Sequence, residues 1–97
     1  MPYKNQLKII GGKEGKAILL FALSTCIWCR KTKVLLGELG LKYSYVDVDL
    51  LNDDDQDEAY NEIEKHSPGG SFPLLVINDG EKIIIGFNES EIKNLNG

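Results

Sequence analysis

The chain has 97 residues, of which 42% are hydrophobic and 27% are charged. This length and apolar content predict a single folded domain over residues 1–97 and argue against a disordered chain. The longest apolar run, residues 17–23, is far shorter than the roughly 20 residues of a membrane helix. Since the N-terminus does not resemble a signal peptide, we expect a soluble, cytoplasmic protein without a membrane partner. We also expect a monomer.

Charge is distributed unevenly along the chain, whose net charge is −4. Residues 1–45 contain eight Lys or Arg and two Glu, whereas residues 46–97 contain three Lys and thirteen Asp or Glu. Solvated faces of opposite sign explain this pattern, although Arg30, Lys31 and Lys33 would also put positive potential beside the two cysteines. An acidic chain with so few clustered bases is a poor nucleic-acid binder, and we expect no nucleic-acid partner.

The first half of the chain predicts two strands and a helix, preceded by an N-terminal extension (residues 1–16) of uncertain structure. In that extension, Leu7, Ile9 and Ile10 could form a short extra strand. Residues 17–22 form a continuous apolar run, which is typical of a strand buried on both faces in a parallel sheet. Residues 43–50 alternate as a further strand. Between them, a helix from Ile27 to Gly40 places five residues on one face: Trp28, Thr32, Leu35, Leu36 and Leu39.

The second half predicts a helix, a hairpin and a final helix. N-cap candidates at 52–55 begin a helix that buries Ala59, Tyr60 and Ile63 and ends at residues 67–70. Strands at 74–77 and 81–85 flank an Asp-Gly turn, which is a strong hairpin signal. Asn88 and Glu91 have the spacing of a capping box before a short helix.

The resulting order is β-α-β-α-β-β-α. It predicts an α/β fold in which a four-stranded mixed sheet is flanked by three helices, with or without the short extra N-terminal strand.

Two cysteines, Cys26 and Cys29, lie where the buried strand gives way to the first helix. The free N–H groups and the dipole at a helix start favour an anion, so this position should stabilise a thiolate at Cys26. Cys29 lies one turn into the helix and should be more enclosed and less ionised. This asymmetry predicts that Cys26 attacks a disulfide and that Cys29 resolves the mixed disulfide. Arg30 and Lys31 would add a small, salt-screened stabilisation of the thiolate.

Two other uses of the cysteines stay open. The pair could belong to a metal or iron–sulfur module, although two thiolates fall short of the four ligands of a structural zinc site. His66 is the one histidine of the chain, and it could serve only with a further ligand or a second chain. We therefore predict no bound metal or cofactor beyond the redox-active Cys26–Cys29 disulfide. The second of these alternatives is a non-catalytic interaction domain, in which the cysteine pair has no redox role.

Together with the proline that opens the third strand, these features resemble the glutaredoxin branch of the thioredoxin superfamily. The resemblance covers residues 17–95 and depends on Cys26-x-x-Cys29, Pro73 and Gly86-Phe87. It implies a thioredoxin-like fold and a dithiol oxidoreductase acting on protein or low-molecular-weight disulfides. It also implies that Pro73 is cis and faces the cysteines, and that the backbone of Phe72 pairs with substrate or glutathione. Trp28, beside the dithiol, would form an apolar wall for a docking partner, although it could instead be a core residue.

Departures from the glutathione-using members bear on the electron donor. Those members commonly carry Lys where this chain has Leu23, and Thr-Val-Pro where it has Ser71-Phe72-Pro73. Gly86-Phe87 is more similar to the redoxins that serve ribonucleotide reductase and take electrons from thioredoxin reductase. The resemblance therefore implies either glutathione, as co-substrate, or a thioredoxin-reductase-type enzyme as donor, and it favours weak coupling to glutathione.

Overall fold

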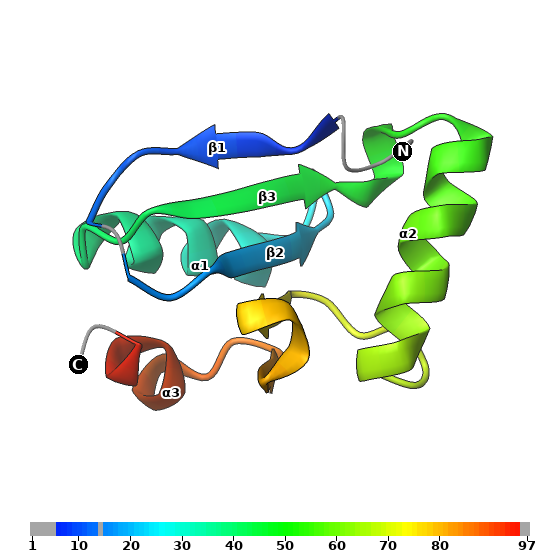
Figure 1. The fold of residues 1–97 in the computed structure, drawn as a ribbon. Coiled ribbons are helices and arrows are strands. Elements are labelled where there is room, and N and C mark those ends of the chain that lie inside the picture. The colour runs from blue at the N-terminus through cyan, green and yellow to red at the C-terminus, as the bar shows by residue number, and fades with distance from the viewer. Residues whose placement is uncertain (1–5, 14, 96–97) are drawn as a thin grey trace.

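The computed structural model describes residues 6–13 and 15–95, which form one mixed sheet with helices on both faces (Figure 1). The five strands are β1 (Lys8–Ile10), β2 (Ile18–Ala22), β3 (Tyr43–Asp47), β4 (Leu74–Ile77) and β5 (Lys82–Ile85). The helices are α1 (Ile27–Glu38), α2 (Asp53–His66) and α3 (Glu89–Asn94), with short 3-10 turns η2 (Val48–Leu50) and η3 (Asn78–Gly80). The predicted thioredoxin-like fold is therefore confirmed, including the extra N-terminal strand.

The strand order across the sheet is β1-β3-β2-β4-β5. β2 and β3 are parallel because α1 connects them as a crossover, whereas β4 pairs antiparallel with both β2 and β5. β1 adds to the outer edge of β3 in the antiparallel sense, with Ile9 opposite Ser44. This order places β2 at the centre of the sheet, where its C-terminal end leads to Cys26.

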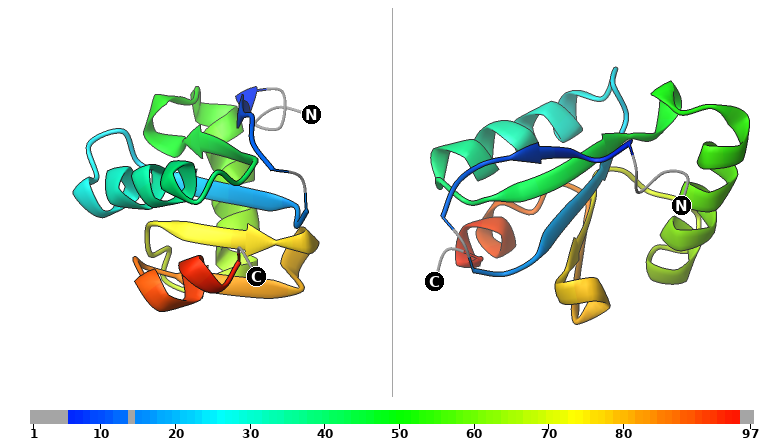
Figure 2. Two further views of the ribbon diagram at one scale, coloured as in Figure 1. Left: turned by 90° about the vertical axis from the view of Figure 1, so that its left-hand side faces the viewer. Right: turned by 45° about the horizontal axis from the view of Figure 1, so that its top comes forward.

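Two apolar layers cover the central strands, one on each face. α1 and α3 contact each other and pack on one face, over a cluster that includes Leu20, Leu36 and Ile92. α2 packs on the other face through Ala59 and Ile63 (Figure 2). Burial on both faces explains why β2 lacks the polar alternation of a half-exposed strand.

The β4–β5 connection is the hairpin that the Asp-Gly signal predicted. Asn78, Asp79 and Gly80 all have positive φ, at 52°, 59° and 109°. Asn, Asp and Gly tolerate the left-handed region better than other residues, so this tripeptide suits the turn. The Asn78 side chain also accepts a hydrogen bond from the Ala17 N–H, which ties the turn to the start of β2.

Two details differ from the sequence-based expectations. The third strand ends at Asp47 rather than Leu50, because residues 48–50 turn into η2. Tyr60 is 39% exposed, so it does not complete the buried stripe of α2. Its ring lies edge-on to the ring of Phe72, with 6.2 Å between the centroids. Of the two alternatives for Trp28, the core position is excluded, because its side chain is 53% exposed.

No described helix is both long and apolar enough to cross a membrane. Within residues 6–13, the strand Lys8–Ile10 is followed by a bridge between Lys13 and Leu41. The remaining residues of the predicted N-terminal extension, 1–5 and 14, lie outside the described part.

We expect Ile63→Ala to lower the free energy of unfolding by about 2–5 kcal/mol, because Ile63 is fully buried between α2 and the sheet. Val34→Ala is the matched control, since Val34 is 54% exposed on α1 and its replacement should cost less than about 1 kcal/mol. Urea unfolding followed by circular dichroism measures both. Equal losses for the two variants would contradict this account of the α2 layer.

Candidate functional site

Cys26 is the N-cap residue of α1. Its backbone is extended (φ −90°, ψ 117°), and its Sγ accepts a hydrogen bond from the Cys29 N–H at 3.1 Å. A Ser, Thr, Asp or Asn oxygen normally takes this role at a helix start. Here the Cys26 sulfur does so, and it lies at the positive end of the helix dipole, where a negative charge is stabilised.

Cys29 has a different environment, although both cysteines are free thiols. Its side chain is fully buried in the cluster beneath α1, whereas Cys26 is half-buried. Burial, with the neighbouring Cys26 sulfur, raises the pKa of Cys29 to about 12. A backbone hydrogen bond at Leu23 and the charge of Lys33 act in the opposite direction without cancelling the rise. Cys29 is therefore a neutral thiol near neutral pH.

The loop before Cys26 is held by a two-point contact with Asp49. The Ser24 N–H donates to Asp49 Oδ1 at 2.8 Å, and the Ser24 hydroxyl donates to Asp49 Oδ2 at 2.5 Å. These hydrogen bonds from Ser24 lower the pKa of Asp49. The clamp is therefore complete above the ordinary pKa of an aspartate and weakens only as the pH falls through the lowered pKa.

An exposed apolar surface adjoins the cysteine pair. Ile27 and Trp28, between the two cysteines, are 63% and 53% exposed. The Trp28 ring lies 5.6 Å from the ring of Phe87, which packs against the same core cluster as Cys26. The Lys31 ammonium lies 4.6 Å from the Trp28 ring centroid, a cation–π distance. The helix thus presents an aromatic surface with a cation at its edge.

The segments around Pro73 and Gly86 are joined to each other. The Phe72–Pro73 peptide bond is cis, as the resemblance implied, and Pro73 is buried. The Gly86 N–H donates to the Pro73 carbonyl at 2.8 Å. Gly86 has φ +78°, a conformation that favours glycine, and the chain then turns toward Phe87. Phe72 packs against both core clusters, including the one that holds Cys26.

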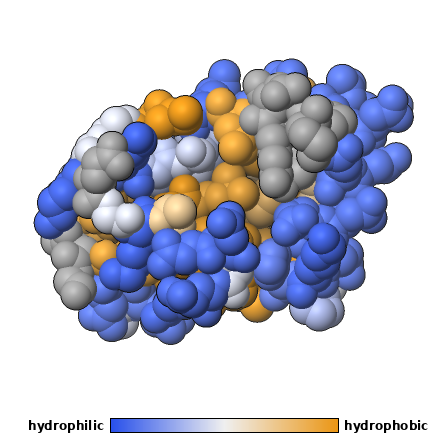
Figure 3. Space-filling view, in the orientation of Figure 1, coloured by the Kyte–Doolittle hydropathy of each residue, from blue (hydrophilic) through white to orange (hydrophobic). Residues whose placement is uncertain are grey.

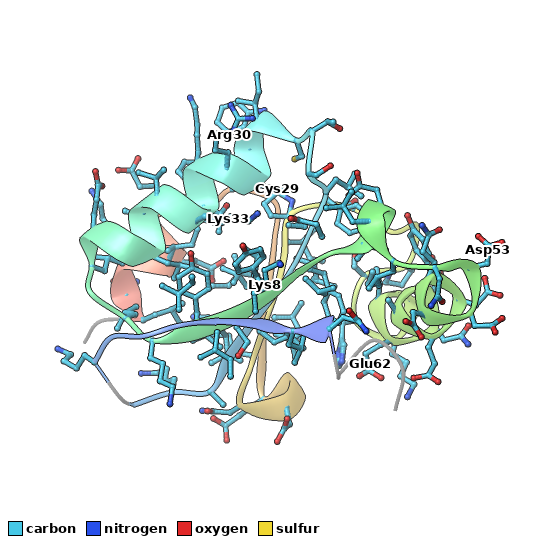
Figure 4. The ribbon with its side chains drawn as sticks, turned by 90° about the horizontal axis from the view of Figure 1, so that it is seen from above. Lys8, Cys29, Arg30, Lys33, Asp53 and Glu62 are labelled. Atoms are coloured by element: carbon cyan, nitrogen blue, oxygen red, sulfur yellow. The ribbon has the colours of Figure 1, made fainter. Side chains whose placement is uncertain are left out.

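The basic residues of α1 point in different directions. Figure 4 shows Arg30 on the outer side of the helix, whereas Cys29 and Lys33 lie on the side that faces the sheet. Lys33 forms an ion pair with Asp47, at 3.0 Å between Nζ and Oδ1. Of the three bases, Lys33 is therefore the one directed into the protein.

Ser24, Asp47 and Asp49 are site residues that the sequence analysis did not single out. Ser24 meets Asp49 across 25 positions of the chain, and Lys33 meets Asp47 across 14. The sequence offered one signal for these contacts, the predicted parallel pairing of β2 and β3, which brings the C-terminal ends of the two strands to the same edge of the sheet.

Within the described residues, no three His, Cys, Asp or Glu side chains come together to form a metal site. His66, the one histidine that could have added a ligand, lies at the end of α2 with its Nε2 3.3 Å from Glu62 Oε2, and its ring packs against Gly80. The cysteines therefore have no third ligand from this part of the chain.

A cavity of about 480 Å³ lies at the other end of β2, lined by Leu19, Tyr43 and Val76 among other residues. Figure 3 shows hydrophobic side chains gathered over the sheet on that face of the molecule, surrounded by hydrophilic ones. None of the predicted site residues lines this cavity, so it is separate from the cysteine site.

Comparisons with known proteins agree on one family. Residues 18–83 match the family model described as Glutaredoxin. The chain is 35% identical over 78 residues to an "uncharacterized glutaredoxin-like 8.6 kDa protein in rubredoxin operon" of Clostridium pasteurianum, covering 80% of this chain and 95% of that protein.

Solved structures are similar over most of the chain. The glutaredoxin of Methanosarcina mazei Go1 is 42% identical, with a TM-score of 0.85 and coverage of 94% of this chain and 87% of that one. The methanoredoxin of Methanosarcina acetivorans is 40% identical, with a TM-score of 0.79 and coverage of 87% and 96%. The fold therefore has counterparts of known structure over most of the chain.

We expect Asp49→Ala to release the loop before Cys26, because both hydrogen bonds to Ser24 are lost. Hydrogen exchange at the Ser24 amide should accelerate about tenfold, the size expected for loss of a charged acceptor near the surface. Asp57→Ala, which removes an exposed carboxylate of α2, is the matched control and should leave that amide unchanged. Unchanged exchange in Asp49→Ala would show that the contact does not hold the loop.

Proposed function

This chain belongs to the glutaredoxin family, and on that basis we propose that it is a dithiol oxidoreductase that reduces disulfides through Cys26 and Cys29. Membership of the family and the Cys-x-x-Cys pair give it a thiol redox role. The observation that carries the finer proposal is the contrast between the two sulfurs. One caps a helix and accepts an N–H, and the other is buried as a thiol.

In the first step, the thiolate of Cys26 attacks one sulfur of the substrate disulfide. A Cys26–substrate disulfide forms, the substrate S–S bond breaks, and the other half of the substrate leaves as a thiolate that takes up a proton from water. The Cys29 N–H and the helix dipole support the thiolate before attack. The half-buried position of Cys26 leaves its sulfur accessible to a partner.

In the second step, Cys29 loses its proton and attacks Cys26 Sγ. The Cys26–Cys29 disulfide forms and the substrate departs as a thiol, so two electrons have passed from the dithiol to the substrate. The proton that Cys29 must lose makes this step depend on pH, because burial disfavours the thiolate.

We assign substrate docking to the surface around the cysteines, made of Trp28, Phe72, Gly86 and Phe87, with the buried Pro73 holding Phe72 through its peptide bond. The exposed Trp28 and its contact with Phe87 support this role, since exposed aromatic side chains are enriched where proteins bind partners. Arg30 and Lys31 would add positive potential at its edge. Within this proposal the protein acts as a cytoplasmic monomer on disulfide-containing proteins, since the cytosol keeps such dithiols reduced.

We further propose that a reductase of the thioredoxin-reductase type, rather than glutathione, is the main electron donor. Leu23 is half-buried and packs against the apolar cluster beneath α2, so it offers no cation to a glutathione carboxylate. Phe72 and Trp28 make the surroundings of the sulfur apolar and aromatic, which suits a protein surface better than a charged tripeptide.

We expect Cys26→Ser to abolish reduction of insulin disulfides, because the attacking thiolate is lost. Cys29→Ser should retain the first step and accumulate a mixed disulfide, visible by mass spectrometry as a covalent adduct that dithiothreitol removes. Each variant is the control for the other, since both remove one sulfur and keep the residue size. Full activity in Cys26→Ser would rule out the proposed mechanism.

The donor is tested by supplying oxidised protein with either glutathione and glutathione reductase or thioredoxin reductase, and by following NADPH oxidation. We expect turnover at least about tenfold faster with thioredoxin reductase, the factor that corresponds to about 1.4 kcal/mol of barrier. Leu23→Lys should raise the rate with glutathione while leaving insulin reduction by dithiothreitol intact. Efficient turnover of the unmodified protein with glutathione would contradict the assignment.

A further inference from the structure

A partly buried ion pair lies one helical turn beyond Cys29. Lys33 Nζ is 3.0 Å from Asp47 Oδ1, and the two side chains are only 25% and 13% exposed. The same ammonium lies 4.2 Å from the ring centroid of Tyr45. A carboxylate and an aromatic ring of β3 therefore hold the cation between the helix and the sheet.

This cation is a neighbour of the buried thiol. Lys33 follows Cys29 by four residues, which places the two side chains on one helical face with about 5–6 Å between their Cβ atoms. Both lie on the sheet side of α1 in Figure 4. Among the described residues, the ionisable groups that contact or act on this pair include Cys26 before the helix, Tyr43, Tyr45 and Asp47 on β3, and Asp49 in η2.

We propose that Lys33, held in place by Asp47 and Tyr45, is a positioning residue for the resolving step and stabilises the thiolate of Cys29 as it attacks the mixed disulfide. The inference rests on the proposed function and identifies the cation that acts on its second step. A lysine side chain loses considerable rotamer freedom when it is fixed, so a lysine without the two β3 contacts would extend into water.

The mixed disulfide changes what Cys29 experiences. In the free dithiol, the hydrogen bond and the charge of Cys26 both raise the pKa of Cys29. Once Cys26 is bonded to substrate, its sulfur is neutral and a weaker acceptor, so the contribution of its charge disappears and that of the hydrogen bond weakens. Burial then remains as the main cause that raises the pKa of Cys29, opposed by the backbone hydrogen bond at Leu23 and by the charge of Lys33.

The step balances without any further reactant. The Cys29 thiol gives its proton to water, and its thiolate attacks Cys26 Sγ. The Cys26–Cys29 bond forms as the bond between Cys26 and the substrate breaks, and the substrate thiolate takes up a proton from water. Lys33 keeps its proton throughout and acts only through its charge.

Reaction of the reduced protein with an aryl disulfide, 5,5′-dithiobis(2-nitrobenzoate), separates the two steps. Attack by Cys26 releases one coloured thiolate at a rate proportional to reagent concentration. Attack by Cys29 on the mixed disulfide releases the second at a rate independent of it. Stopped-flow absorbance therefore measures the first step and the resolving step in one protein.

We expect Lys33→Met to slow the concentration-independent phase and to leave the first phase unchanged. Each unit by which the pKa of Cys29 rises lowers the thiolate fraction tenfold, and the greater nucleophilicity of a more basic thiolate recovers about threefold, so the net loss is about threefold per unit. The pH profile of this phase should shift to higher pH. Lys33→Arg, which retains the charge, should resolve at a rate close to that of the unmodified protein.

Two further variants serve as controls. Lys65→Met removes an exposed, ion-paired lysine of α2 and should change neither phase. Lys33→Gln keeps a donor for Asp47 without the charge, so it repeats the test if Lys33→Met does not fold. An unchanged second phase in the folded neutral variants, or an equal slowing in Lys65→Met, would overturn the inference. Absence of two phases in the unmodified protein would instead contradict the proposed function.

Discussion

Burial of β2 on both faces determines where the cysteines can lie. Leu20, Phe21 and Ala22 are completely inaccessible to solvent, with α1 and α3 on one side and α2 on the other. A strand held in this way cannot slide or rotate without exposing apolar surface, at about 25 cal/mol for each Å². The loop that leaves its C-terminal end therefore starts from a fixed point. The N-terminus of α1, and with it Cys26, is placed a few residues later.

The same edge of the sheet also fixes the groups around the two sulfurs. β3 runs parallel to β2, so Asp47 and the following η2 turn emerge beside the loop that carries Cys26. Asp49 holds the loop through Ser24, and Asp47 holds Lys33 beneath the helix. β4 is the other neighbour of β2, and Pro73 lies just before its first residue. The Pro73 carbonyl accepts a hydrogen bond from the Gly86 N–H. Apolar packing of β2 therefore determines where the two cysteines lie, whereas these polar contacts determine how the neighbouring loop and side chains are oriented.

Local patterns in the sequence predicted the fold and the centre of the site. The apolar run at residues 17–22, the Asp-Gly turn and the spacing of Asn88 and Glu91 are signals within a few residues, and the structure has the corresponding strand, hairpin and cap. Trp28 was harder to place, because helical periodicity defines a face without showing how far the sheet extends beneath it. Its ring lies against Phe87, 59 positions later, and is 53% exposed.

The polar pairs were beyond such patterns for a related reason. Lys33 and Asp47 were visible as charges, and Asp47 and Asp49 as the polar positions of an alternating segment. Their partners depend on the register between β2 and β3, in which Ala22 lies beside Asp47. Where the third strand stops also matters, because η2 begins at Val48 and redirects Asp49 toward Ser24. Register and strand ends are settled by packing of the whole sheet.

The cap of α1 couples helix stability to the chemical state of the protein. In most helices the capping side chain keeps one chemical state. Here the Cys29 N–H donates to the sulfur of Cys26, which changes its chemical state when it is oxidised. Oxidation or adduct formation replaces a potential anion by a neutral, weaker acceptor, so the first turn of α1 loses part of its stabilisation at the same moment. Suppose that the cap stabilises the folded dithiol more than the folded disulfide. By thermodynamic linkage, the difference between these two stabilisation free energies makes reduction of the disulfide more favourable by the same amount. A folded helix end is thus one determinant of the reduction potential.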